Sequence, residues 1–321
     1  MTLYFDQLTA NNGDSSVIDC IGNTNLIELR KIVPDDYARV FAKLESQNPT
    51  GSMKDRMALS VVDRAVESGR LATGGTLVEY TGGSTGTSLA FVCAAYGFAA
   101  SMVTSDAFSQ EKRDHMRALG ANVVEIHSED GRITKQLIEQ MMERATELSA
   151  APGAFFADQF NNVDAIVGYK PLAEEAWAQS GGRIDAFVHS VGTAHSIAGV
   201  ADVLRSHNPQ LKVVAVEPAE SAVLSGGQPG AHGIEGIGAG FVPPLWRDDI
   251  ADDIAQVTTD EAKEMSRRLA RDEALFAGTS SGANVVVSLR EAEKLGRDQA
   301  VLTIICDSGL KYLSTDLYGS R

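Results

Sequence analysis

The feature that most constrains this chain is the alternation of short β-rich runs with longer amphipathic stretches, which starts near residue 38. Such alternation is typical of βαβ units, in which helices connect the strands of a parallel sheet, so the pattern predicts an α/β fold. The amphipathic stretches include residues 109–120, where Gly120 suits a helix C-terminus, and residues 133–149. The clearest strands are predicted at ARVFAKLE (38–45), GTLVEY (75–80), AASMVTS (99–105), ANVVEIH (121–127), GAFFADQF (153–160), IDAFVHS (184–190), LKVVAVEP (211–218) and AVLTIIC (300–306).

Length and charge narrow the class of protein. A chain of 321 residues can bury a large core and is long enough for two globular lobes. No run approaches the roughly 18 consecutive apolar residues that a membrane helix needs. The net charge of −15, with scattered Lys and Arg, argues against nucleic acid or a membrane surface as a partner. We therefore expect a small-molecule partner, with no nucleic acid and no membrane.

The cysteines and the N-terminus indicate a cytoplasmic setting. Cys20, Cys93 and Cys306 are odd in number, far apart and without CxxC spacing, which favours a reducing compartment and argues against a zinc site. MTLYFDQLTANNGDSS at the N-terminus lacks the basic and apolar regions of a secretory signal. No metal is expected.

Three small-residue turns lead into predicted helices, at residues 75–97, 184–204 and 275–289. The N-terminus of a helix offers unpaired backbone N–H groups that bind anions without a cationic side chain. Neither the P-loop pattern nor the GxGxxG spacing is present, so nucleoside triphosphates and dinucleotides fit poorly. A smaller phosphate-bearing ligand remains, held by a cradle formed by Gly192, Thr193, Ala194, His195 and Ser196.

Two alternatives to the phosphate cradle stay open, because a Gly-rich turn can serve packing alone and His195 can be structural or solvent-facing. Residues 225–244 are rich in Gly and Pro and predict a long irregular loop, a kind of segment that is often functional.

Lys54 lies behind a Pro-Thr-Gly-Ser turn, in NPTGSMKDRM (48–57). Ser52 is predicted as the helix N-cap, with Asp55 in the first turn, so the lysine lies at a helix N-terminus. The helix dipole disfavours a positive charge there and lowers the pKa of the amine, which is what a nucleophilic lysine needs. Without that context, a solvated surface charge would be the simpler interpretation.

The motifs occur in an order that carries a resemblance over nearly the whole chain. They are IGNTNL (21–26), KLESQNPTGSMKDR (43–56), VEYTGGSTGTSLA (78–90), EKRDHMRALGA (111–121), DQFNN (158–162), VGTAHSIAGV (191–200), VAVEP (214–218), GIGAGF (236–241), AGTSSGA (277–283) and SGLKYLST (308–315). With them the chain resembles the cysteine synthase and cystathionine β-synthase family of fold-type II pyridoxal-phosphate enzymes, and is most similar to O-acetylserine sulfhydrylase-like members.

The resemblance implies a tryptophan synthase β-like fold of two α/β domains, each a mostly parallel twisted sheet with flanking helices. Residues 48–158, with part of 1–25, would form a smaller mobile domain. Residues 159–321, with about 26–47, would form the larger domain that binds pyridoxal 5'-phosphate. The active site would lie in the cleft between them, and a homodimer is implied.

The resemblance also implies roles for individual residues. Lys54 matches the catalytic lysine that forms an imine with the cofactor and later moves the Cα proton. The cradle from Gly192 to Ser196 matches the phosphate loop, and Ser280 matches the hydroxyl that faces the pyridine nitrogen. A neutral serine partner there weakens the electron sink and favours elimination and replacement at Cβ over transamination.

Substrate contacts follow from the same resemblance. The turn formed by Thr81, Gly82, Gly83, Ser84 and Thr85 matches the loop that binds the α-carboxylate, Gln159 closes over it, and Gly236 lines the entrance. Several positions depart from the family pattern: Ser84 stands for an asparagine that contacts the cofactor ring, GTAHS for GTGGT, Asn25 for proline and SGLKY for SGERY. These departures indicate a divergent subgroup.

The sequence therefore predicts a cytoplasmic enzyme that replaces the leaving group of an O-activated serine, with O-acetylserine and sulfide giving cysteine and acetate. Three alternatives use the same chemistry: cystathionine synthesis, cysteine desulfhydration, and serine or threonine deamination. Two others remain open, a catalytically silent relative that binds the cofactor, and a nicotinamide oxidoreductase from the α/β pattern alone.

Overall fold

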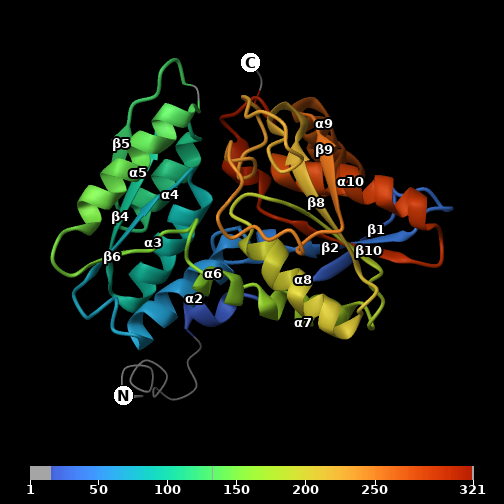
Figure 1. Cartoon of the computed structure of the whole chain (residues 1–321), viewed down its shortest axis with the longest axis horizontal. Coiled ribbons are helices and arrows are strands. Elements are labelled where there is room, and N and C mark those ends of the chain that lie inside the picture. Colours follow the sequence, from blue (N-terminus) through green and yellow to red (C-terminus); the bar gives the residue numbers. More distant parts are fainter. Residues whose placement is uncertain (1–15, 132, 320–321) are drawn as a thin grey trace.

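The computed structural model describes residues 16–131 and 133–319, in which two β-sheets are flanked by helices (Figure 1). The α/β class predicted from the sequence is confirmed. Of the segment 1–25, part of which is assigned to the smaller domain, residues 1–15 lie outside the described residues, and so does nearly all of the stretch 1–16 that lacks the pattern of a secretory signal.

The larger sheet has six strands in the order β1-β2-β10-β7-β8-β9. Strand β1 is antiparallel to β2, and the other neighbours are parallel. The central strands are nearly continuous runs of Val, Ile, Leu and Ala, as expected for a parallel sheet that is covered on both faces. The strands are β1 (Leu26–Leu29), β2 (Arg39–Leu44), β7 (Ala186–Ser190), β8 (Lys212–Pro218), β9 (Asp253–Val257) and β10 (Ala300–Ile305).

The smaller sheet has four parallel strands in the order β5-β4-β3-β6. The strands are β3 (Thr76–Tyr80), β4 (Ala99–Ser105), β5 (Asn122–Ile126) and β6 (Ala154–Phe156). Strand β6 is shorter than the predicted 153–160, because Asp158 adopts a left-handed backbone conformation with φ of 48°. The chain leaves the sheet there and carries Gln159 away from the ladder.

Helices cover both faces of each sheet (Figure 1). On the larger sheet, α9 and α10 pack on one face, while α7 and α8 pack on the other. On the smaller sheet, α5 packs on the face opposite α2 and α3. The helices are α2 (Lys54–Glu67), α3 (Ser84–Tyr96), α4 (Gln110–Ala118), α5 (Lys135–Ser149), α6 (Asp164–Val167), α7 (Lys170–Gln179), α8 (His195–His207), α9 (Thr259–Asp272) and α10 (Thr279–Leu295), with 3-10 turns η1 (Val17–Cys20), η2 (Glu45–Gln47), η3 (Ala219–Ser221) and η4 (Gly309–Tyr312).

The predicted strands all occur, and two further strands do not follow from the sequence pattern. Both β1 and β9 are short edge strands that carry charged or polar residues, as edge strands commonly do, and this weakens their apolar signal. The predicted helices 109–120 and 133–149 are α4 and α5, and Gly120 ends the first with φ of 84°. Residues 225–244 form the predicted irregular loop, without helix or strand.

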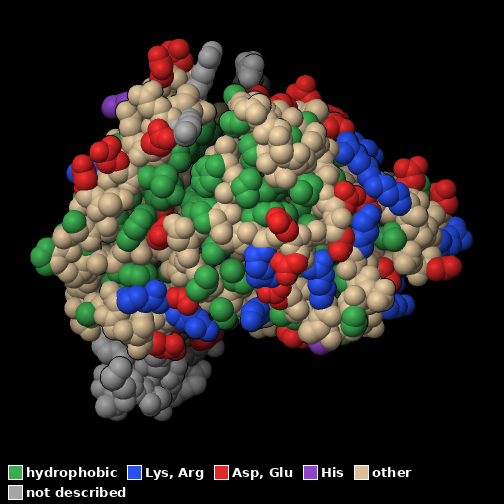
Figure 2. Space-filling view, in the orientation of Figure 1, with side chains coloured by type: hydrophobic (Ala, Val, Ile, Leu, Met, Phe, Trp, Pro, Cys, Tyr) green, Lys and Arg blue, Asp and Glu red, His purple; other side chains and the backbone are tan. Residues whose placement is uncertain are grey.

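The surface agrees with the charge argument. On the face in Figure 2, Lys and Arg side chains are interspersed with Asp and Glu. Among residues 16–131 and 133–319, no helix combines the length and apolar character required to cross a membrane.

Candidate active site

Lys54 is the first residue of α2, so the predicted position at a helix start is correct. The N-cap is Met53 rather than the predicted Ser52, because Ser52 is held in an isolated β-bridge with Asp307. The Ser52 hydroxyl still accepts a hydrogen bond from the Lys54 backbone N–H, at 3.2 Å. The Met53 N–H donates to the Cys306 carbonyl at 2.8 Å, which ties the start of α2 to the end of β10.

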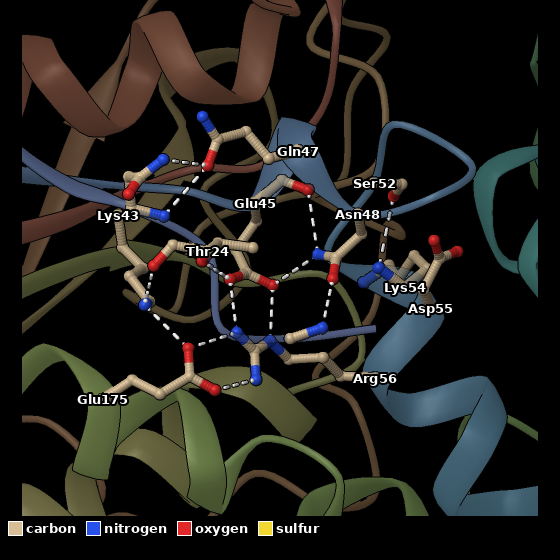
Figure 3. Close-up of polar contacts among 12 residues, drawn as sticks. Thr24, Lys43, Glu45, Gln47, Asn48, Ser52, Lys54, Asp55, Arg56 and Glu175 are labelled. Carbon is tan, nitrogen blue, oxygen red and sulfur yellow. Dashed lines mark hydrogen bonds and ion pairs between the residues drawn. The ribbon is translucent and has the colours of Figure 1, made fainter. Parts of the chain in front are cut away.

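A buried ion-pair network anchors the turn before Lys54 (Figure 3). The Arg56 guanidinium donates two hydrogen bonds to Glu45, at 2.7 and 2.9 Å, and two to Glu175, both at 2.8 Å. The Asn48 amide also donates to Glu45, at 2.8 Å. Two-pronged Arg–carboxylate bonds fix orientation as well as position. The network therefore joins η2, α2 and α7 and sets the direction in which α2 leaves the turn.

The pKa of the Lys54 amine is lowered, as predicted. Burial is the principal cause, whereas the sequence argument relied on the helix dipole. The neighbouring Cys306 and Asp307 side chains act in the opposite direction. An amine with a lowered pKa is more readily available as a nucleophile and as a base.

The turn from Thr81 to Thr85 follows β3 and leads into α3, which begins at Ser84. Gly83 has φ of 129°, and the Thr81 hydroxyl accepts hydrogen bonds from the N–H groups of Gly83 and Gly86, at 2.9 and 3.1 Å. The N-cap residue, Gly83, has no side chain that could cap the helix, so the Thr81 hydroxyl serves one of its first-turn N–H groups. The turn, including Gly82, thus presents backbone donors of the kind that bind a carboxylate.

Gln159 lies against this turn, as predicted, and accepts a hydrogen bond from the Thr85 hydroxyl at 2.9 Å. Its amide donates to the Tyr80 carbonyl at 2.8 Å. Glu79, which sequence reasoning missed, accepts hydrogen bonds from the N–H groups of Tyr80 and Gln159, at 2.9 and 3.0 Å. Burial raises the pKa of Glu79 well above its usual range. A lone acidic residue inside a predicted strand was the signal for it.

The predicted phosphate cradle lies between β7 and α8. Ala194 adopts a left-handed conformation with φ of 68°, and the Thr193 hydroxyl lies 2.9 Å from Nδ1 of His195. Gly192 approaches the 225–244 loop so closely that a Cβ there would lie 2.5 Å from the Gly236 carbonyl oxygen. His195 is buried rather than solvent-facing. Burial, with the nearby Lys54 charge, lowers the pKa of its imidazole to about 3, so the ring is neutral.

The 225–244 loop brings the cradle together with α10. The Gly238 N–H donates to the Val191 carbonyl at 3.1 Å, and the Glu235 N–H donates to the Thr279 hydroxyl at 3.0 Å. Ser280, the second residue of α10, is buried beside Cys306. Burial raises the pKa of the Cys306 thiol to about 12, and its hydrogen bond with Ser280 acts in the opposite direction.

Lys112 is a second residue that sequence reasoning missed, although it lies in the matched motif 111–121. Its stem packs on Gly83, where a Cβ would lie 2.5 Å from Lys112 Cδ. Its ammonium lies 2.5 Å from Glu235 Oε2 and 4.3 Å from the centre of the Tyr312 ring. Lys112 therefore connects the carboxylate-binding turn with the 225–244 loop.

All the predicted residues lie at the carboxyl ends of parallel strands or in the loops that meet there, which is where open α/β sheets bind ligands. A cavity of about 470 Å³ lies instead at the opposite ends of β2, β7 and β10, and none of the predicted residues lines it. The candidate active site is therefore the group of predicted residues around Lys54, and not this cavity.

The residues fit pyridoxal phosphate. These residues offer helix N-termini for anions and a half-buried lysine of lowered pKa for an aldehyde. Nε2 of His195 is buried beside the cradle and near the Gln159 backbone, but it makes no hydrogen bond of normal geometry among the described residues, which fits a polar atom that would contact the cofactor.

Comparison with known proteins agrees with this fit. The family model described as "Pyridoxal-phosphate dependent enzyme" matches residues 17–307. A cysteine synthase from Staphylococcus aureus is 40% identical over 305 residues, covering 94% of this chain and 96% of the relative.

Two crystal structures are also similar. One is a cysteine synthase from Entamoeba histolytica, with a TM-score of 0.88 and 34% identity, covering 97% of this chain and 92% of that one. The other is an O-acetylserine dependent cystathionine β-synthase from Helicobacter pylori, with a TM-score of 0.89 and 33% identity, covering 95% and 99%. The chain belongs to the family of pyridoxal-phosphate dependent enzymes, with the fold-type II architecture.

Proposed function

We propose that this chain catalyses a pyridoxal-phosphate dependent β-replacement on an O-activated L-serine, in which O-acetylserine and sulfide give L-cysteine and acetate. The observation that carries the proposal is the convergence of Lys54, an amine of lowered pKa, with the helix starts at Ser84, His195 and Thr279. The cysteine synthases that the chain resembles over most of its length support the same reaction. The bond from Cβ to the ester oxygen breaks, a bond from Cβ to sulfur forms, and acetate leaves with the electron pair.

Each cofactor contact can be assigned to a described residue. When bound, pyridoxal phosphate supplies an aldehyde for the substrate amine and a ring that accepts the electrons of the broken Cα–H bond. Gly192, Thr193, Ala194, His195 and Ser196 would hold the phosphate through the N-terminus of α8. Ser280 would face the pyridine nitrogen, and Ser84 would lie at the ring hydroxyl.

The substrate would be oriented by its α-carboxylate. Thr81, Gly82, Gly83, Ser84 and Thr85 would bind it through backbone N–H groups and hydroxyls, with Gln159 held over them by Thr85. Gly236 would shape the entrance. Lys54 would take the Cα proton on Nζ, since its lowered pKa leaves the amine able to accept one.

The domain limits belong to the proposal as well. Residues 48–158, with part of 1–25, would move against residues 159–321, with about 26–47, and the site would lie in the cleft between them. The smaller sheet lies wholly within residues 76–156, which supports this division. The enzyme would act in the cytoplasm as a homodimer, and light scattering on the purified protein would test the dimer.

Spectroscopy and peptide mapping test the central residue. We expect visible absorption from the cofactor, and a pyridoxyl group on Lys54 after borohydride reduction and mass mapping. Lys54→Ala should lose the adduct and the activity, whereas Lys170→Ala, at an exposed lysine, should keep both. A colourless protein, or an adduct on another lysine, would contradict the proposal.

The nucleophile requires a separate assay. The Helicobacter relative makes cystathionine synthesis from O-acetylserine the second candidate. Sulfide consumption, cystathionine formation and pyruvate release should be compared over a panel of serine derivatives. We expect cysteine from O-acetylserine and sulfide to predominate. Predominant pyruvate would indicate a desulfhydrase or deaminase, and bound cofactor without a spectral response to any amino acid would indicate a silent binding protein.

A further inference from the structure

His189 is a fully enclosed imidazole in β7, three residues before the cradle. Its Nε2 lies 2.8 Å from the Ser196 hydroxyl oxygen, and its Nδ1 lies 3.3 Å from Nδ2 of Asn284. The Phe187 ring stacks near it, with ring centres 5.8 Å apart. His189 thus connects the second residue of α8 with the buried face of α10.

The partners of Asn284 determine which nitrogen of His189 carries the proton. The Asn284 Oδ1 accepts from the Ser190 N–H at 2.8 Å, and its Nδ2 donates to the Ile304 carbonyl at 2.9 Å and also lies 3.4 Å from the Cys306 Sγ. These two bonds fix the orientation of the amide, so a donor group faces Nδ1 of His189. Burial, followed by the Lys54 charge, lowers the pKa of His189 to about 3, so the ring is neutral and has one N–H. Nδ1 therefore accepts, and Nε2–H donates to Ser196.

The direction of this bond matters for the phosphate. A hydroxyl that accepts from His189 keeps its own hydrogen free to donate elsewhere. We propose that His189 is a positioning residue that fixes Ser196 as a hydrogen-bond donor toward the cofactor phosphate. The inference rests on the proposed function, in which the cradle holds that phosphate. Asn284 lies one helical turn after Ser280, so the same network connects the phosphate end of the site with the pyridine end.

The test measures cofactor binding rather than turnover. His189→Phe keeps an aromatic ring but removes both hydrogen bonds, and His189→Gln restores an N–H donor. Thr303→Val is the matched control. The buried hydroxyl of Thr303, in β10, donates at 2.9 Å to the carbonyl of Val188, which lies in the same strand as His189, and this bond does not involve the cradle. The readouts are the dissociation constant of pyridoxal phosphate, by reconstitution, and the ³¹P resonance of the phosphate in the holoenzyme.

We expect His189→Phe to weaken cofactor binding about tenfold, the size of one lost hydrogen bond to a charged group, and to shift the ³¹P resonance. Ser196→Ala should cause a similar loss, and the double variant should lose little more, because the two residues act through one hydroxyl. His189→Gln should recover most of the affinity, and Thr303→Val should leave both readouts unchanged.

Two results would overturn the inference: a loss with Ser196→Ala but none with His189→Phe, or full additivity of the two losses. If His189→Phe does not fold, His189→Leu, which also removes both hydrogen bonds, takes its place in the comparison with Ser196→Ala. A Ser196→Ala variant with unchanged affinity and unchanged ³¹P resonance would instead show that the phosphate lies elsewhere, which is a failure of the proposed cradle.

Discussion

Arg56, two residues beyond Lys54, forms a two-pronged, buried ion pair with Glu45, with Nε–Oε2 and Nη2–Oε1 distances of 2.7 and 2.9 Å. The pair lies where the chain passes from η2 into α2. Because both partners are removed from water, the geometry tolerates little movement without leaving a charge unpaired. The position of Lys54 is therefore tied to that of Arg56.

Glu45→Gln should lower the free energy of unfolding by about 3–5 kcal/mol, because it leaves the buried Arg56 guanidinium without one of its charged partners. Urea denaturation measures the change. The matched control is Glu147→Gln, which breaks an exposed pair with Arg144 at 2.7 Å and should cost less than about 1 kcal/mol. Equal losses in the two variants would show that the buried network does not hold the turn.

Stability should depend on Glu175 as the pH falls. Burial raises the pKa of this carboxyl, but hydrogen bonds and charges from Arg56 and Lys43 outweigh burial and lower it to about 2. A folded-state pKa below the unfolded value of about 4.3 adds stability at neutral pH that is lost as the pH falls from about 5 to about 2. The difference in unfolding free energy between the wild type and Glu175→Gln should shrink over this range. A constant difference would contradict the assignment.

Glu79→Gln should raise the KM for the amino-acid substrate about tenfold, with a smaller effect on kcat. Each side-chain oxygen of Glu79 accepts a backbone N–H, from Tyr80 and from Gln159, so the new NH2 group would face one of these donors and the segment over the carboxylate-binding turn would shift. Steady-state kinetics measure the change. Glu125→Gln, in β5 of the same sheet, should leave KM unchanged. A lower melting temperature with unaltered KM would show that Glu79 contributes to stability but does not position the substrate-binding turn.

Gly192→Ala should weaken pyridoxal phosphate binding about tenfold or more, because its Cβ would lie 2.5 Å from the Gly236 carbonyl oxygen and would force the cradle apart. Cofactor content and the dissociation constant on reconstitution measure the effect. Gly97→Ala is the control, since Gly97 has φ of 77° and open space around it, so the variant should lose stability without losing cofactor. Similar cofactor loss in both variants would show that the cradle does not bind the cofactor.

Much of the fold could be predicted because hydrophobic periodicity and the residues that end helices and strands are local properties of the sequence. Gly120 and the amphipathic run before it predict the end of α4, and the strand predictions hold wherever apolar residues are continuous. Strands β1 and β9 were missed because edge strands need fewer apolar residues. The predicted N-cap at Ser52 was wrong because pairing with Asp307, more than 250 residues away, overrides a local capping preference.

The sequence by itself determined the α/β class, the three turns that lead into helices and the order of motifs that indicates the family, since these depend on neighbouring residues. Only the tertiary structure decided which side chains support the site. His189, Glu79 and Lys112 contact Ser196, Gln159 and Glu235, which lie 7, 80 and 123 positions away. The acidic residue within a predicted strand marks Glu79 but not its distant partner, and His189 and Lys112 have no such local signal, because burial and hydrogen-bond geometry arise only when the chain folds.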